Sequence, residues 1–201
     1  MKVLDPVSYQ IRKEAILHHA RHLFATKGLS ETSMDDIAQS CHMQKASLYH
    51  YFESKQQIQQ ELVDLECARW AARFKDYETG KDLRETLTLI GKIFLKDMEN
   101  DAGRREFFKI IFFESHKNPS VLKAMKESPT YNRQGFYAVF ARHLEGRMPR
   151  RQIAMFITQF MGGLVHYLNM AKLRGENMCL ELFTDEEYVD QLVKIFVKGI
   201  A

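Results

Sequence analysis

The sequence has few of the residues that interrupt helices. Only 4 of its 201 residues are proline and 10 are glycine. Proline removes a backbone donor and glycine loosens a helix, so their scarcity favours long helices joined by few turns. Apolar residues recur at helical spacing, and no alternating pattern long enough for a useful strand is present. We therefore predict an all-α fold.

Cysteine and long apolar runs are also scarce. The 3 cysteines, Cys41, Cys67 and Cys179, are widely spaced and form neither a CxxC pair nor a zinc-binding pattern. This usage favours buried, reduced thiols in a cytoplasm. The most apolar stretch, 153–168, is too short and too interrupted by polar residues to span a bilayer. Because the first residues also lack an apolar signal region, we expect a cytoplasmic protein with no membrane segment.

A strong charge of one sign is absent as well. The net charge is +3, and residues 1–60 carry seven Lys and Arg side chains against six Asp and Glu. Overall charge therefore does not by itself argue for a nucleic-acid partner. Partial protonation of histidines beside DNA phosphates would add positive charge. Five of the 8 histidines fall in this segment: His18, His19, His22, His42 and His50. Evidence for DNA binding must come from where the charges sit.

Helical periodicity predicts helices along the whole chain. The expected ranges are about 8–27, 33–41, 44–51, 54–77, 81–100, 103–116, 119–127, 129–145, 149–173 and 184–199. Pro119, Pro129 and Pro149 each fit the first turn of a new helix, and Ser128 is a plausible N-cap. Residues 175–183 are the expected long loop. No flexible linker is visible, so the two halves of the chain should share the fourth helix.

Several helix ends carry recognisable signals. Gly28 follows the first helix at a position suited to a left-handed cap. Ser33 with Asp36 three residues later predicts a capping box at the start of the second helix. The same pattern appears at 54–57 and at 184–187.

The segment 33–52 is predicted to form two short helices joined by a tight turn. Such a unit places its second helix in the major groove while the first braces it across the backbone. Leu48 and Phe52 lie four residues apart and can face the core with Ile37 and Phe24. The other side chains then point outward, where they can donate to phosphates or base edges: Lys45, Ser47, Tyr49 and His50. Short helix pairs of this kind also occur in proteins that never touch DNA.

At these residues the chain resembles the TetR/AcrR family of bacterial transcription regulators. The matching runs are Phe24-Ala25-Thr26-Lys27-Gly28-Leu29, Thr32-Ser33-Met34-Asp35-Asp36-Ile37-Ala38, Lys45-Ala46-Ser47-Leu48-Tyr49-His50-Tyr51-Phe52 and Ser54-Lys55. Together they cover about residues 9–60 and form a specific pattern, whereas the rest matches only as a layout of helices. The resemblance implies a helix-turn-helix DNA-binding domain at 1–53, built as a three-helix bundle. It also implies a ligand-sensing and dimerisation domain at 54–201, a bundle of about six helices.

The resemblance also implies which side chains meet DNA. Recognition-helix contacts would come from Lys45, Ser47, Tyr49 and His50, and contacts to flanking phosphates from Thr32, Ser33 and Lys55. Two residues depart from the family pattern. His42 stands where the turn usually has Gly, which should cost about 1 kcal/mol or more. Gln44 stands where Ser or Thr usually caps the helix, and Gln is a poor N-cap. Gln44 is a further candidate contact, because its amide suits an adenine edge.

Two predicted helices near the end of the chain, 149–173 and 184–199, are strongly apolar. The first is apolar around most of its axis, so it must be buried on most sides. The resemblance implies that both pair with their copies across a two-fold axis, which would suit a palindromic operator with two half-sites. The expected interface residues are Phe156, Phe160, Gly163, Leu164, Tyr167, Leu192 and Phe196. A purely intramolecular core is the alternative.

Aromatic residues are concentrated on several of the remaining helices. We expect some of them to line an apolar pocket for a small lipophilic or aromatic effector. The candidates are Trp70, Phe74, Phe108, Phe112, Phe136, Phe140, Met161 and His166. Tight core packing is the alternative for each one. An effector that favours one orientation of the fourth helix would change the spacing of the two recognition helices and release a repressor from its operator.

Other classes of function have less support. The sequence contains no phosphate-binding glycine loop, no nucleophile elbow and no HExxH motif, so an enzyme is not expected. His116, His143 and His166 fall on different predicted helices, so no metal site is expected, and no cofactor is implied. A helical adaptor that binds proteins through the N-terminal helices remains the alternative to a DNA-binding homodimer.

Overall fold

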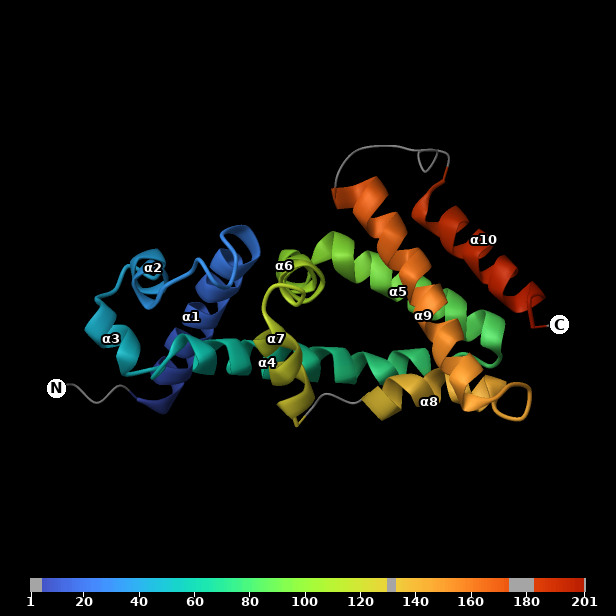
Figure 1. The fold of residues 1–201 in the computed structure, drawn as a ribbon, viewed down its shortest axis with the longest axis horizontal. Coiled ribbons are helices and arrows are strands. Elements are labelled where there is room, and N and C mark those ends of the chain that lie inside the picture. The colour runs from blue at the N-terminus through green and yellow to red at the C-terminus, as the bar shows by residue number, and fades with distance from the viewer. Residues whose placement is uncertain (1–4, 130–132, 174–182, 201) are drawn as a thin grey trace. The chain divides into compact units, whose positions relative to one another are not determined.

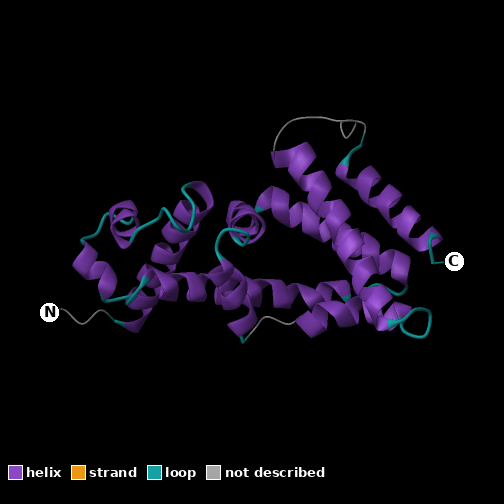
Figure 2. Ribbon diagram, viewed as in Figure 1, coloured by secondary structure: helices purple, strands orange, loops and turns teal. Residues whose placement is uncertain are grey.

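The computed structural model describes residues 5–129, 133–173 and 183–200. Every regular element within these ranges is helical, as Figure 1 and Figure 2 show, and the predicted all-α fold is confirmed. The α-helices are α1 (Pro6–Thr26), α2 (Met34–Ser40), α3 (Lys45–Tyr49), α4 (Lys55–Tyr77), α5 (Leu83–Asn100), α6 (Ala102–Lys109), α7 (Pro119–Glu127), α8 (Arg133–Leu144), α9 (Arg150–Tyr167) and α10 (Asp185–Lys198). Two π-helical segments, η1 (Ile110–Glu114) and η2 (Leu168–Leu173), continue α6 and α9.

One predicted helix start is wrong, and another is displaced by one residue. Pro129 lies in a turn, and α8 begins later, at Arg133. Ser128 caps the C-terminal end of α7 instead of the N-terminal end of α8. Pro149 precedes α9 as its cap residue and is not inside the first turn. Proline fixes φ and lacks a donor, so it marks a turn as readily as a helix start. Nearly all of the expected loop at 175–183 lies outside the described residues.

The predicted capping boxes of α2 and α10 are both present. In α2, the Asp36 N–H donates to Ser33 Oγ at 3.1 Å, and the Ser33 N–H donates to Asp36 Oδ2 at 2.7 Å. The third box, at α4, is displaced by one residue. Ser54 Oγ accepts from the Gln57 N–H at 3.2 Å, but Gln57 Oε1 accepts at 2.7 Å from the N–H of Glu53. All three helix starts nevertheless satisfy backbone donors that would otherwise be unpaired.

Packing divides the chain into two compact units. Unit 1 comprises Met1–Arg69 and Asp101–Tyr131, and unit 2 comprises Trp70–Asn100 and Asn132–Ala201. The division falls inside α4, so both units share this helix, as predicted. Unit 1 also includes α6, η1 and α7, whereas the functional division at residues 53 and 54 stays a prediction. No helix in the described ranges has the length and apolar character needed to cross a membrane.

The core of unit 1 joins the first four helices to α6, η1 and α7. Ile16, Ala20 and Phe24 of α1 meet Ile37 of α2 in this core. The other buried apolar members are Leu17, Leu29, Ala38, Leu48, Phe52, Ile58, Leu62, Val63, Cys67, Phe107, Ile110, Val121 and Ala124. Burial of a large apolar side chain stabilises a fold by about 1.5–3 kcal/mol, so this cluster holds the helices together.

A buried ionic cluster joins α1, α4 and α6 within unit 1. Arg21 is 7% exposed; its Nη1 lies 3.1 Å from Glu66 Oε1 and its Nε lies 3.2 Å from Glu106 Oε2. Glu66 is fully buried, and burial raises the pKa of its carboxyl while Arg69 and Arg21 act in the opposite direction. A side chain at position 103 would collide with the Arg21 guanidinium, so Gly103 makes room for it. Loss of either partner would leave a buried charge uncompensated, which is strongly destabilising.

Unit 2 contains an aromatic core between α8, α9 and α10. The Phe140 ring lies 6.4 Å from that of Phe160, and the Phe196 ring lies 5.4 Å from Phe160, all centroid to centroid. Arg142 of α8 secures the end of α4 by donating to the carbonyls of Glu78 at 2.7 Å and Gly80 at 2.8 Å. The segment that follows α4 is therefore fixed to α8 by hydrogen bonds.

The turn between α2 and α3 has a strained residue. His42 has φ of 51°, the left-handed conformation that its place in the turn predicted. The Met43 N–H donates to the Ala38 carbonyl at 2.9 Å and closes the turn. Gln44 precedes α3, and its side chain makes no capping hydrogen bond in the described structure. Short α3 is thus held by its contacts with the core and not by a strong cap.

Replacing His42 by Gly is expected to raise the free energy of unfolding by about 0.5–1 kcal/mol. The change relieves about 1–2 kcal/mol of strain from the left-handed conformation. The greater conformational freedom of Gly in the unfolded chain offsets about 0.4–1 kcal/mol of this gain. Chemical denaturation measures the difference. Gly28→Ala is the matched control and should lose stability, because Gly28 has φ of 98°. A loss of stability in His42→Gly would mean that the imidazole contributes contacts that outweigh the strain.

Candidate nucleic-acid interface

The recognition-helix candidate, α3, presents the face that the sequence predicts. Leu48, on α3, and Phe52, just beyond it, are both 0% exposed and belong to the core of unit 1. Lys45 and His50 are exposed, and Tyr49 is 46% exposed. Residues four apart lie on the same side of a helix, so Leu48 and Phe52 turn one side of this segment toward the core, while Lys45, Tyr49 and His50 stay exposed. Gln44 is also exposed, and Ser47 is half-buried.

Lys45 has a carboxylate partner on the neighbouring helix. Its Nζ lies 2.8 Å from Oδ2 of Asp35, in the first turn of α2. The hydrogen bond that Lys45 donates to the Asp35 carboxylate raises the pKa of Lys45, so the ammonium stays charged at neutral pH. Both side chains are about half exposed, at 49% and 54%. The predicted DNA-contacting cation is therefore accessible and already paired.

A polar hollow of about 370 Å³ lies beside α3. Its lining residues are Ser30, Glu31, Thr32, Ser33, Met34, Tyr49, Glu53, Ser54, Lys55 and Gln56. The hollow thus includes the cap residues of α2 and α4, where helix ends carry partial positive charge that favours an anion. Glu31 and Glu53 oppose that preference, so the hollow has mixed charge.

Two of the predicted phosphate contacts have structural partners instead. Lys55 Nζ donates to the carbonyls of Leu29 and Thr32, each at 2.8 Å. The Thr32 side chain is 1% exposed, and its hydroxyl donates to the Gly28 carbonyl at 2.7 Å. The expectation of a hydroxyl contact from Thr32 is therefore wrong for this arrangement, because the group is buried. Lys55 fastens the loop after α1, while its contact with phosphate stays a prediction, as does that of the exposed Ser33.

Sequence reasoning missed a support for α3 at the start of α1. The rings of Tyr9 and Tyr51 stack with centroids 5.0 Å apart, and Tyr9 Oη donates to the His50 carbonyl at 3.5 Å. This contact joins residues about forty positions apart in the sequence. Helical periodicity locates Tyr51 near the core but cannot identify its partner on another helix.

Two of the five histidines in this region have partners inside the chain. His19 Nδ1 lies 2.9 Å from Ser40 Oγ, and burial lowers the pKa of His19, with His18, His42 and His22 lowering it further. The lowered pKa disfavours the charged form of His19 in the free chain. His22 Nδ1 lies 2.6 Å from a Glu106 carboxylate oxygen and faces an internal partner.

The predicted pocket residues are divided between the two units. Phe108 belongs to unit 1, whereas Trp70 belongs to unit 2 and packs near Phe94, with ring centroids 6.2 Å apart. Phe136 and Phe140 contact each other at 5.3 Å, Met161 is half-buried, and the side chains of Phe74 and Phe112 lie outside the described part of the structure. His166 is exposed on α9, and its assignment to an apolar pocket stays a prediction.

Most of the predicted dimer residues lie inside unit 2. Phe160 and Leu164 are 0% exposed, and Tyr167 is 2% exposed. A Cβ added at Gly163 would lie 3.0 Å from Leu192 of the same chain, so this glycine leaves room for α10. The expectation that Phe160, Leu164 and Tyr167 form the interface is therefore wrong, because their own chain buries them. Gly163 and Leu192 are half-buried, so their assignment to the interface stays a prediction.

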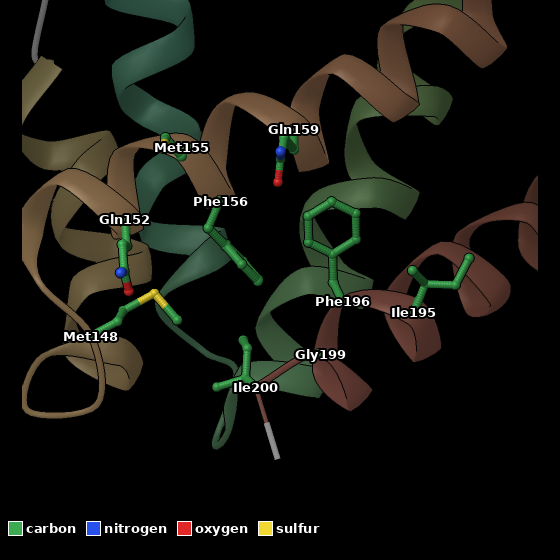
Figure 3. Close-up of a pocket in the computed structure, with 9 residues that line it drawn as sticks. All are labelled: Met148, Gln152, Met155, Phe156, Gln159, Ile195, Phe196, Gly199 and Ile200. Carbon is green, nitrogen blue, oxygen red and sulfur yellow. The ribbon is translucent and has the colours of Figure 1, made fainter.

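An apolar hollow of about 350 Å³ opens on the surface of unit 2 between α9 and α10 (Figure 3). Phe156 and Phe196, the remaining predicted dimer residues, meet edge to face in it with centroids 5.0 Å apart. Met155 and Ile195, also in the lining, are 56% and 68% exposed. The lining is completed by Met148, Gln152, Gln159, Gly199 and Ile200. This surface exposes large apolar side chains of the kind that protein interfaces cover.

Comparison with known proteins gives a specific match in the N-terminal region. The family described as bacterial regulatory proteins, tetR family, matches residues 16–62. The negative transcriptional regulator IcaR of the biofilm operon icaADBC, from Staphylococcus aureus (strain Newman), is 45% identical over 51 residues. That match covers 25% of this chain and 27% of IcaR, so the chain spans about a quarter of this curated relative's length.

Solved structures extend the likeness to nearly the whole chain. FadR from Bacillus subtilis, in complex with stearoyl-CoA, has a TM-score of 0.68 at 13% identity and covers 94% of this chain and 99% of its own. A TetR-family transcriptional regulator from Bordetella parapertussis 12822 has a TM-score of 0.67 at 18% identity and covers 96% and 95%. At these identities the likeness concerns the fold alone.

The matched segment and the shared fold agree with the geometry of α2 and α3. Residues 16–62 hold both short helices, the turn between them and the core that orients α3. Over residues 16–62 the chain matches the tetR family of bacterial regulatory proteins.

Proposed function

We propose that the chain is a transcription regulator that binds duplex DNA with α3 in the major groove. The orientation of α3 carries this proposal, because Lys45, Tyr49 and His50 are exposed beside the fully buried Leu48. A cation, a phenol and an imidazole on one helix face can donate to phosphates and base edges. The family match supports this function, and IcaR is named a negative transcriptional regulator.

The proposed complex is a homodimer on a palindromic operator, and the protein acts as a repressor. The exposed Met155 and Ile195 around the apolar hollow support pairing of α9 and α10 with their copies. A two-fold dimer presents two recognition helices, so each half-site would receive one α3. Occlusion of a promoter is the simplest consequence of such binding.

The proposed effector is a lipophilic or aromatic molecule bound in unit 2. The aromatic side chains there, including Trp70, Phe94 and Phe136, support an apolar ligand. FadR of Bacillus subtilis, which shares the fold, was solved with stearoyl-CoA. Since α4 belongs to both units, a ligand that favours one placement of α4 would shift the population away from the DNA-binding form.

Replacing Lys45 by Ala is expected to weaken DNA binding about tenfold at low salt without unfolding the protein, the loss expected for one charge-assisted contact. The difference should shrink as salt rises, because phosphate contacts are screened. Gel shifts with DNA from upstream of the protein's own gene measure both effects. Lys123→Ala on α7 is the control, since Lys123 is also exposed. Equal affinities for Lys45→Ala and wild type would contradict the interface, and no salt-dependent binding by wild type would favour a protein-binding adaptor.

Replacing both Met155 and Ile195 by Glu is expected to convert a dimer into a folded monomer. The two carboxylates would have to be buried unpaired in a dimer, whereas they are hydrated in the monomer. Sedimentation at micromolar concentration measures the mass. Leu122→Glu is the control, because Leu122 is 45% exposed on α7, outside the proposed interface. A wild-type protein that sediments as a monomer would contradict the dimer.

A long-chain acyl-CoA or an aromatic effector is expected to raise the melting temperature and weaken DNA binding. A ligand at about 100 times its Kd stabilises the folded state by roughly 2.7 kcal/mol, which corresponds to several degrees for a chain of this size. Differential scanning fluorimetry across long-chain fatty acids, acyl-CoAs and aromatic compounds tests this, with free CoA and butyrate as controls. Unchanged melting across the whole panel would contradict an apolar effector site.

A further inference from the structure

Most cations near the proposed interface are already engaged inside unit 1. Those with internal carboxylate or carbonyl partners are Lys13, Arg21, Lys27 and Lys55. Among the described residues 5–60, Arg12 is the cation for which the structure gives no ion pair or hydrogen bond. Lys45 is the cation on the exposed face of α3, and it too has a partner. Apart from Arg12, the charge that these residues offer to DNA therefore depends on whether Lys45 leaves its partner.

The geometry of the Lys45–Asp35 ion pair allows Lys45 to exchange Asp35 for another partner. Its Nζ–Oδ2 distance is 2.8 Å, and both side chains are about half exposed, so solvent screens the attraction. Asp35 belongs to the first turn of α2, where the helix dipole favours a carboxylate. The carboxylate is thus fixed by its helix, whereas the long lysine side chain can turn to a new partner.

We propose that Asp35 acts as an internal competitor for DNA phosphate, holding Lys45 in the free protein and lowering the affinity of the interface for duplex DNA. The inference rests on the proposed DNA binding by α3 and adds a residue that sets its strength. A carboxylate and a phosphate both accept charge-assisted hydrogen bonds from an ammonium group. When Lys45 moves to a phosphate, Asp35 loses its partner and faces the negatively charged duplex.

The competition has a recognisable dependence on salt. A lysine that neutralises a phosphate displaces condensed counterions from DNA, which steepens the decline of affinity with salt. In this protein the same step breaks an ion pair that salt also weakens, so part of that decline is cancelled. Removal of the Asp35 charge should therefore make binding both tighter and more sensitive to salt.

The test compares Asp35→Asn with wild type on a labelled duplex of about 30 base pairs and mixed sequence, because phosphate contacts need no operator. Fluorescence anisotropy at several salt concentrations gives Kd and its salt dependence. Asp35→Asn is expected to bind about 3–10-fold tighter at low salt, with a slope of log Kd against log salt steeper by up to about one. Melting curves verify that each variant is folded.

Two further variants separate competition from a general change of charge. Glu127→Gln changes net charge equally and breaks the Lys123–Glu127 pair on α7, so its affinity should match wild type. Placing Asp35→Asn in a Lys45→Ala background should reduce the gain to less than about twofold, because the competed cation is gone.

The outcomes are distinguishable. Wild-type affinity and slope in Asp35→Asn, or a gain that persists fully without Lys45, would overturn the role of Asp35 while leaving DNA binding intact. Weaker binding by Asp35→Asn would also overturn it and would point to a carboxylate that contacts a cytosine amino group. Absence of salt-dependent binding by wild-type protein would instead remove the proposed function itself, and the inference with it.

Discussion

The burial of Leu48 and Phe52 is the constraint on which the account of this protein depends. With five residues, α3 is too short to be stable alone and has no side-chain cap hydrogen bond in the described structure. Its orientation comes from two fully buried anchors spaced four residues apart. The same anchors direct Lys45 and Tyr49 outward. If the core of unit 1 did not hold these anchors, the polar face of α3 would have no defined direction.

Ionic contacts in unit 1 serve mainly to hold helices and loops in place. Arg21 joins α1 to α4 and α6, and Lys55 fastens the loop after α1 through backbone carbonyls. Arg21 is 7% exposed and cannot contact a phosphate without loss of these structural contacts. The nearly balanced charge of residues 1–60 is therefore compatible with DNA binding, because the position of Lys45 matters more than the sum of charges.

Local patterns made the helices, the two confirmed capping boxes and the orientation of α3 predictable from the sequence. These features depend on residues within four positions of one another, which periodicity reads directly. The stack of Tyr9 on Tyr51 and the burial of Phe160 between helices depend on partners far along the chain, so no local pattern reveals them. For the same reason, the apolar sequence of α9 did not predict which of its side chains face the core and which, like Met155, are exposed.

The most direct test of the central claim is acetylation of lysines in the presence and absence of duplex DNA, measured by mass spectrometry. Lys45 and Lys123 are both exposed, but only Lys45 lies on the outward face of α3. If Lys45 contacts DNA, saturating duplex slows the acetylation of Lys45 and leaves the acetylation rate of Lys123 unchanged. Equal rates for Lys45 with and without DNA, under conditions where the duplex is bound, would contradict it.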